Sequence, residues 1–273
     1  MLESILKDFQ KLANKEKASI LSRFFKTGKG QYGYGDKFLG IVVPLQRMLS
    51  KKYKELPFKD IEKLLHSSIH EHRLTALFIL IERFKKALKE GDKRNIEKIV
   101  KFYLSNTKNI NNWDLVDLSA PNIFGEYLKI QSQVQAKSML NHLAKSNNLW
   151  ERRISILSTF TFIKNNKFDL TIQIAKILLF DRHDLIQKAV GWMLREVGKR
   201  DNKELINFLE KYSSEMPRTM LRYSIEKFPE SKRKYFLNTS YEKARAKKVS
   251  TKKEGINKKS SSKKSHSKKG AKN

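Results

Sequence analysis

The amino-acid sequence predicts an all-α protein, and three observations support this fold class. Apolar residues recur with the helical period of 3.6 along almost the whole chain up to about residue 240. Convincing alternation of apolar and polar residues, which would indicate strands, is absent. Similar segments also recur about every 40 residues. A succession of amphipathic helices joined by short loops is typical of an all-α fold.

The apolar periodicity assigns the helices in chain order. The expected segments are 2–14, 17–26, 44–53, 58–68, 70–89, 93–105, 111–119, 132–145, 149–164, 169–179, 183–199, 202–213 and 217–228. In the second of these, within "KASILSRFFK", one side of the helix carries Ile20, Leu21, Phe24 and Phe25.

The recurring segments predict a helical repeat protein. "EHRLTALFILIERF", "NNWDLVDLSAPNIF" and "ERRISILSTFTFIK" can be laid together so that Arg73, Trp113 and Arg153 are spaced by 40, and "IQKAVGWMLREVG" follows about 35 residues later. A period near 40 with two or three helices per unit is the signature of HEAT or armadillo arrays. We therefore expect a curved HEAT-like solenoid in which corresponding helices line a concave surface.

The composition changes near the C-terminus, so we expect a helical domain over residues 1–238 and a tail over 239–273. Residues 241–273 hold 13 Lys and Arg against 2 Glu and scarcely an apolar side chain. Such a segment cannot bury enough apolar surface to offset its ordering entropy, which predicts disorder. It could attract phosphates non-specifically, or simply keep the protein in solution.

The net charge of +30, from 58 Lys and Arg against 28 Asp and Glu, indicates an anionic partner such as nucleic acid or a membrane surface. The absence of cysteine excludes disulfides and thiol chemistry. The first residues lack the features of a signal peptide, and no apolar run approaches the ~20 residues of a membrane span. We expect a soluble, intracellular and monomeric protein without a membrane partner: cytoplasmic, and nucleoid-associated if bacterial.

The stretch "GKGQYG" matches the dinucleotide-binding pattern G-x-G-x-x-G at Gly28, Gly30 and Gly33. That fingerprint requires a strand before it and a helix directly after it. Here a helix precedes it, and further glycines and a proline follow. The pattern therefore indicates a flexible loop.

The segment "HDLIQKAVGWMLREVGK" predicts a helix with two different faces. The apolar face carries Ile186, Ala189, Val190, Met193 and Val197. The opposite face carries Lys188, Trp192, Arg195 and Lys199. A tryptophan among cations can stack on a sugar or base while the cations hold phosphates. The alternative is a tryptophan that packs against the next repeat.

In "NNWDLVDLSAP", Trp113 and Asp117 are four residues apart and share a helical face, away from the core side of Leu115 and Leu118. Pro121 is expected to end this helix. A carboxylate on the working surface of a basic protein would repel phosphate. It could pair with a Lys or Arg of a neighbouring repeat, or it could meet a cation or a developing positive charge.

One repeat further on, "LWERRISI" contains Arg152 and Arg153 in the first turn of a helix. These arginines could be solvated, or they could clamp phosphates bidentately if they lie in a groove. Trp113 with Asp117, then Arg153, then Trp192 come from successive units and could line one concavity.

Four segments, "FLGIVVPLQR", "NWDLVDLSAP", "LWERRISI" and "HDLIQKAVGWMLRE", together resemble an AlkD-like DNA alkylpurine glycosylase, the HEAT-like family that repairs alkylated DNA. They stand in the family's order and approximate spacing over about residues 38–196. We expect the fold of this family to extend over residues 1–235. The four together are more specific than any one segment.

The resemblance implies hydrolysis of the N-glycosidic bond of cationic bases, such as 3-methyladenine and 7-methylguanine, in duplex DNA. It also implies that neither metal nor cofactor is needed, and that the base is not flipped into a pocket as in other glycosylases. By the matching motifs, Asp117 is the expected catalytic carboxylate. Trp113 and Trp192 are expected to pack on the deoxyribose, and Arg153 is expected to contact the DNA backbone.

The residues are chemically suited to this reaction. An N3- or N7-alkylated purine already carries positive charge and leaves as a neutral base, so the enzyme must mainly stabilise the charge that moves to the sugar. One carboxylate and two aromatic faces can do so. Lys188 and Arg195 are then candidate DNA contacts, as are Tyr32, Tyr34, Lys29 and Lys37 of the glycine-rich segment.

Two other functions remain as alternatives. One is a helical module that binds damaged or branched nucleic acid without catalysis. The other is a HEAT-type scaffold for an acidic protein. Asp117 separates the first alternative from the glycosylase, because a pure phosphate binder gains nothing from that carboxylate. The scaffold leaves Trp113 and Trp192 unexplained as an aligned pair.

Overall fold

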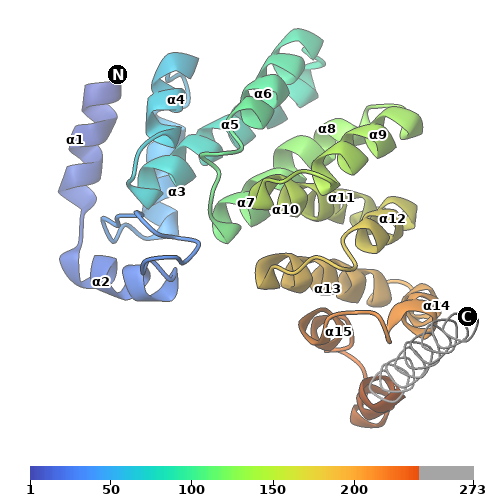
Figure 1. The fold of residues 1–273 in the computed structure, drawn as a ribbon. Helices are drawn as coiled ribbons and strands as arrows, with labels where there is room; N and C mark the ends of the chain where they lie inside the picture. Colours follow the sequence, from blue (N-terminus) through green and yellow to red (C-terminus); the bar gives the residue numbers. More distant parts are fainter. Residues whose placement is uncertain (240–273) are drawn as a thin grey trace, which may run out of the picture.

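The structure, a computed structural model, describes residues 1–239 as a succession of helices. These helices follow one another along a curve from α1 to α15 (Figure 1). Among the described residues there is no β-strand, and one isolated bridge pairs Lys37 with Ile69. The predicted all-α fold is therefore confirmed. Apart from residue 239, the predicted tail lies outside the described residues.

The helices have the following bounds. The first part of the chain forms α1 (Leu2–Leu12), α2 (Lys15–Phe24), α3 (Val43–Lys52), α4 (Phe58–Leu65), α5 (His70–Glu90) and α6 (Lys93–Ser105). The middle part forms α7 (Trp113–Ala120), the π-helical segment η1 (Pro121–Gly125), α8 (Glu126–Lys129), α9 (Gln133–Ala144), α10 (Leu149–Ser158) and α11 (Phe160–Lys164). The last part forms α12 (Asp169–Ile177), α13 (Asp184–Gly198), α14 (Asn202–Tyr212) and α15 (Arg218–Ser224), and residues 230–239 are also helical.

The α-helix ends just before Pro121, as expected, because α7 ends at Ala120, but the chain stays helical beyond the proline. The chain continues from α7 through η1 into α8. Proline removes one backbone donor and crowds the preceding turn, which the wider π-turn relieves. Side chains bond two of the carbonyls near this turn: Asn122 Nδ2 donates to Leu118 O at 2.7 Å, and Thr161 Oγ1 donates to Pro121 O at 2.9 Å.

The helix expected over 149–164 is divided in two at Thr159. The Thr159 hydroxyl donates to the carbonyl of Ile156 at 2.7 Å. Such side-chain bonds to a carbonyl of the preceding turn compete with the helical ladder and bend helices. The remaining expected helices occur near their expected positions, with ends shifted by a few residues.

A continuous apolar core runs through the stacked helices. The apolar face expected for α13 is confirmed, because Ile186, Val190 and Met193 are fully buried. Gly191 lets α15 pass close to α13, since a Cβ atom there would lie 2.5 Å from the carbonyl oxygen of Met220. None of the described helices is long and apolar enough to cross a membrane.

Helix α2 is the exception to this packing, because it buries none of its residues. Ile20 is 67% exposed and Phe24 is 62% exposed, whereas Phe25, just after the helix, is 6% exposed. At Gly40, with a φ of +77°, the chain passes so close to α2 that a Cβ would lie 2.1 Å from the carbonyl oxygen of Asn14. The segment between α2 and α3 therefore holds α2 by backbone contact.

Candidate active site

A cavity of about 480 Å3, which we call the tryptophan cavity, lies where α7, α10 and α13 meet the chain after α2. It is lined by Phe24, Lys26, Tyr32, Trp113, Asp117, Arg153, Asp184, Leu185, Lys188, Trp192, Arg195 and Tyr223. Of the site residues expected from the sequence, seven are in this set: Tyr32, Trp113, Asp117, Arg153, Lys188, Trp192 and Arg195. Trp113, Asp117, Arg153 and Trp192, which were expected to line one concavity, therefore do lie around one cavity.

Asp117 and Arg153, both in the lining of the cavity, form a bidentate ion pair. Arg153 Nε donates to Asp117 Oδ1, and Arg153 Nη2 donates to Asp117 Oδ2, both at 2.8 Å. Burial raises the pKa of Asp117 above its ordinary value, against the opposing effect of the guanidinium. Two parallel N–H donors are the geometry of an ionised carboxylate. The pairing with a neighbouring repeat that the sequence left open is therefore present.

Arg153 also joins two sides of the cavity. Its third nitrogen, Nη1, donates to the carbonyl oxygen of Leu185 in the first turn of α13, and the residue is only 4% exposed. One guanidinium on α10 thus contacts both α7 and α13. These three bonds use three of the five N–H donors of the guanidinium, so a contact with a DNA phosphate would have to use the second N–H of Nη1 or Nη2.

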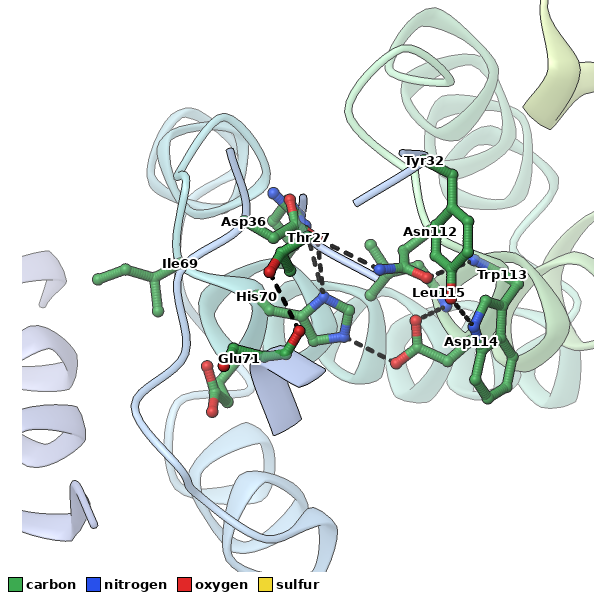
Figure 2. Close-up of polar contacts among 12 residues, drawn as sticks. Thr27, Tyr32, Asp36, Ile69, His70, Glu71, Asn112, Trp113, Asp114 and Leu115 are labelled. Atoms are coloured by element: carbon green, nitrogen blue, oxygen red, sulfur yellow. Dashed lines mark hydrogen bonds and ion pairs between the residues drawn. The ribbon is translucent and has the colours of Figure 1, made fainter. Parts of the chain in front are cut away.

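Trp113 is held by the loop that follows α2. Its Nε1–H donates to the hydroxyl oxygen of Tyr32 at 3.0 Å, as Figure 2 shows. Its ring lies against Phe25, with centroids 5.5 Å apart and planes inclined by 28°, and against the edge of Phe24 at 5.9 Å. Asn112 caps α7 by accepting from Trp113 N at 2.8 Å.

Trp192 is held within its own helix. Its Nε1–H donates to Glu196 Oε1, one turn further along α13, at 3.2 Å. The same oxygen accepts from Lys199 Nζ at 2.7 Å. The Trp192 ring lies 6.2 Å from that of Phe160. Trp192 is only partly buried and lines the cavity, so it both packs against a neighbour and keeps some of its surface free.

The charges around the cavity favour a polyanion. Lys26, Arg153, Lys188 and Arg195 outnumber the two carboxylates of Asp117 and Asp184. Lys188 pairs with Asp184 at 2.9 Å, and Arg195 pairs with Glu226 of the chain after α15. Pairs near the surface contribute little stability and can exchange partners at small cost, so both cations remain available to a phosphate.

Lys29, Tyr34 and Lys37 do not line the tryptophan cavity. Tyr34 is 65% exposed in the glycine-rich loop, which we define as residues 26–37. Lys37 is exposed at its side chain, while its backbone pairs with the segment before α5. Their proposed DNA contacts would lie beside the cavity and stay predictions, as do the roles of the other seven residues.

Sequence reasoning missed Phe24, Lys26, Asp184, Leu185 and Tyr223 as cavity residues. Asp184 and Leu185 lie within the segment that carries Trp192, so their position next to it could have been expected. Phe24 was assigned to an apolar face, which the structure leaves largely exposed. Tyr223 belongs to α15, where no pattern in the sequence pointed to the site.

Among residues 1–239, no group of three or more His, Cys, Asp or Glu is arranged to hold a metal ion.

Comparison with known proteins identifies the family. A search of the curated proteins finds no match. A solved structure described as a predicted DNA alkylation repair enzyme from Enterococcus faecalis matches with a TM-score of 0.62 and 18% sequence identity, covering 80% of this chain and 97% of that one. At this identity the likeness shows a common fold. The family profile described as DNA alkylation repair enzyme matches residues 5–228. The chain therefore belongs to the DNA alkylation repair family, whose work on alkylated DNA makes DNA its partner.

Proposed function

We propose that this protein is a DNA glycosylase that hydrolyses the N-glycosidic bond of cationic N3- or N7-alkylated purines in duplex DNA, without flipping the base. The observation that carries the proposal is the tryptophan cavity. It brings the carboxylate of Asp117, two indoles and a surplus of cations from four separate elements to the same place. Each of these groups has a part in the reaction.

The carboxylate acts on the sugar. When the bond breaks, its electron pair leaves with the purine, which becomes neutral, and positive charge develops on the deoxyribose. Water then adds to the anomeric carbon and loses a proton. The fixed negative charge of Asp117 stabilises this cationic sugar and orients the water. Arg153 keeps the carboxylate ionised and holds both of its oxygens in place.

The tryptophans and the cations bind the substrate. The ring faces of Trp113 and Trp192 attract a positively charged sugar through their π-electrons. Their N–H edges are already bonded to Tyr32 and Glu196, so it is the faces that remain for the nucleotide. Lys188 and Arg195 on one rim of the cavity can hold the phosphates on either side of the lesion.

The ion pair also favours a second candidate, a module that binds damaged or branched DNA without catalysis. In that case Asp117 has a structural task, which is to neutralise a buried Arg153. The two candidates differ in whether Asp117 is required for base release.

The deciding measurement is base release from a duplex with one 7-methylguanine, at equal DNA occupancy for each variant. We expect Asp117→Asn to lower the rate constant roughly 100-fold or more, because an oriented charge at the reacting centre is lost. Asp181→Asn is the matched control, since Asp181 pairs with the adjacent Arg152 at 2.7 Å but does not line the cavity. We expect its rate constant to stay near that of wild type.

Tight binding of the duplex without base release by the wild type would favour the binding module. An equal loss in both variants would mean that breaking a buried Arg–Asp pair, and not the removal of the carboxylate from the site, lowers the rate.

A further inference from the structure

The glycine-rich loop is fastened to the rest of the protein next to His70, the first residue of α5. Lys37 N donates to Ser68 O at 2.8 Å, and His70 N donates to Lys37 O at 2.9 Å. These two backbone bonds place Asp36, at the end of the loop, beside the His70 ring. The loop carries Tyr32, so its attachment bears on the tryptophan cavity.

The His70 ring lies between two carboxylates from different elements (Figure 2). Nε2 contacts Asp114 Oδ2, on α7, at 2.7 Å, and Nδ1 contacts Asp36 Oδ2, on the loop, at 3.4 Å. The residue is 3% exposed, and the rings of Phe25 and Phe38 cover it at 4.8 and 5.1 Å between centroids. A histidine that meets a carboxylate at each nitrogen can donate to both only as an imidazolium.

Charge balance also favours the imidazolium. The charged groups that face the ring are Asp114 from α7, Asp36 from the loop and Arg73 from α5 itself. Arg73 pairs with Asp36 at 2.7 Å and is 4% exposed. A neutral His70 would leave the buried carboxylate of Asp36 and the partly buried carboxylate of Asp114 with one cation, and an uncompensated charge away from water is unfavourable.

The loop and α7 meet at a second point. Asn112 Nδ2 donates to Asp36 Oδ2 at 3.2 Å, while Asn112 Oδ1 caps Trp113 N. Asp114 directly follows Trp113, and its Oδ1 accepts from Leu115 N at 2.8 Å. Of the two carboxylates that contact His70, Asp36 is therefore bonded to the residue that caps Trp113, and Asp114 directly follows Trp113 in α7.

We propose that His70 is a positioning residue for the tryptophan cavity, whose imidazolium joins Asp36 of the glycine-rich loop to Asp114 of α7 and so keeps Tyr32 hydrogen-bonded to Trp113. The effect on base release rests on the proposed glycosylase function. The hydrogen bond between Tyr32 and Trp113 can be observed without it.

The titration of His70 supports this role. Burial and the nearby charge of Arg73 lower the pKa of His70, but its hydrogen bonds with Asp114 and Asp36 and its charge interaction with Asp114 raise it from 6.5 to about 9. His72, two residues further along α5, has no carboxylate partner, and burial lowers its pKa to about 4. Because the folded-state pKa of His70 is raised, its stabilising contribution is complete below pH 6.5 and is lost as the pH rises through about 9.

The direct test is the 15N–1H spectrum of the three tryptophan indoles in the full-length chain, recorded from pH 7 to 10.5. Single Trp→Phe variants assign the peaks. We expect the Trp113 indole to titrate with a midpoint near 9 while the Trp192 indole, bonded to Glu196, stays in place. Burial raises the pKa of Tyr32 above its ordinary value, so its own ionisation would be seen only at higher pH.

Three variants test whether the contacts of His70 with Asp36 and Asp114 cause the titration of the Trp113 indole. Asp114→Asn keeps the cap on Leu115 but removes the charge, so the midpoint should fall by about one pH unit or more. Asp36→Asn changes only the contact on the loop side. It should lower the midpoint less, because Asp36 lies farther from the His70 ring than Asp114 does. His66→Gln is the control, since His66 bonds to the neutral Asn106 at 3.0 Å. In this variant the Trp113 indole peak should move with pH as it does in wild type.

His70→Gln should remove the titration and lower the base-release rate constant about fivefold at pH 7 with unchanged DNA affinity, the effect of one lost neutral hydrogen bond at Trp113. A Trp113 indole that does not move between pH 7 and 10, or that titrates identically in Asp114→Asn, would overturn the proposal. If the wild type releases no base, the glycosylase function fails. The indole titration still shows whether His70 keeps Tyr32 hydrogen-bonded to Trp113.

Discussion

The two tryptophans of the cavity are held by opposite means. Trp192 bonds to Glu196, four residues away on its own helix, so its orientation is a local property of α13. Trp113 bonds to Tyr32, 81 residues away on the glycine-rich loop. The Trp192 side therefore forms whenever α13 folds, whereas the Trp113 side forms only when the loop docks on α5 and α7. We expect the two sides to differ in their sensitivity to mutation and pH.

The largest effect is expected where the two sides are joined. Arg153→Met should lower the free energy of unfolding by about 3–5 kcal/mol, because Asp117 would remain buried without its cation. It should also raise the pKa of Asp117 further, so the acid limb of the base-release profile should move to higher pH. Urea unfolding and the pH profile measure these two changes.

Arg152→Met is the matched control for this prediction. Arg152 Nε donates to Asp181 at 2.7 Å in an ion pair outside the cavity, so its loss should leave the pH profile unchanged. An Arg153→Met protein as stable as wild type would show that the pair contributes no net stability. Arg153 would then be free for the DNA contact that the sequence suggested.

The next effect separates the two aromatic faces. Trp113→Ala and Trp192→Ala should each slow base release about 30-fold, which corresponds to about 2 kcal/mol for a cation facing a desolvated ring. Trp113→Ala should also lower the melting temperature more, because its ring packs on Phe24 and Phe25. A Trp192→Ala protein that loses stability and activity together would mean that Trp192 serves only packing.

The smallest effect compares the two supports. Tyr32→Phe removes the acceptor of the Trp113 indole and should slow base release about fivefold, the equivalent of about 1 kcal/mol. Glu196→Gln keeps an acceptor for Trp192 and should change the rate less. The indole peaks give the internal check, since each variant should shift only its own tryptophan. If Tyr32→Phe and Glu196→Gln slowed base release equally, the local bond that holds Trp192 and the long-range bond that holds Trp113 would not differ in their importance for the rate.

The fold was largely accessible from the sequence because its signals are local. The apolar face of α13 and the shared face of Trp113 and Asp117 follow from the spacing of residues on a helix. The continuation of the chain past Pro121 was not accessible, since it depends on side chains of Asn122 and Thr161 that bond carbonyls near the π-turn. Helical spacing also indicated that Ile20 and Phe24 belong to an apolar side, but not that this side lies exposed.

For the candidate site, the sequence by itself determined which residue types are available and on which helical faces they lie. The bond between Trp192 and Glu196, which the structure shows, spans one helical turn and so lies within the reach of helical spacing. Only the tertiary structure decided that Arg153 pairs with Asp117, that Tyr32 bonds to Trp113 and that His70 lies between Asp36 and Asp114. The physical reason is distance along the chain. Helical periodicity specifies neighbours within one element, whereas partners 36, 81 or 44 residues apart meet only once the repeats have stacked.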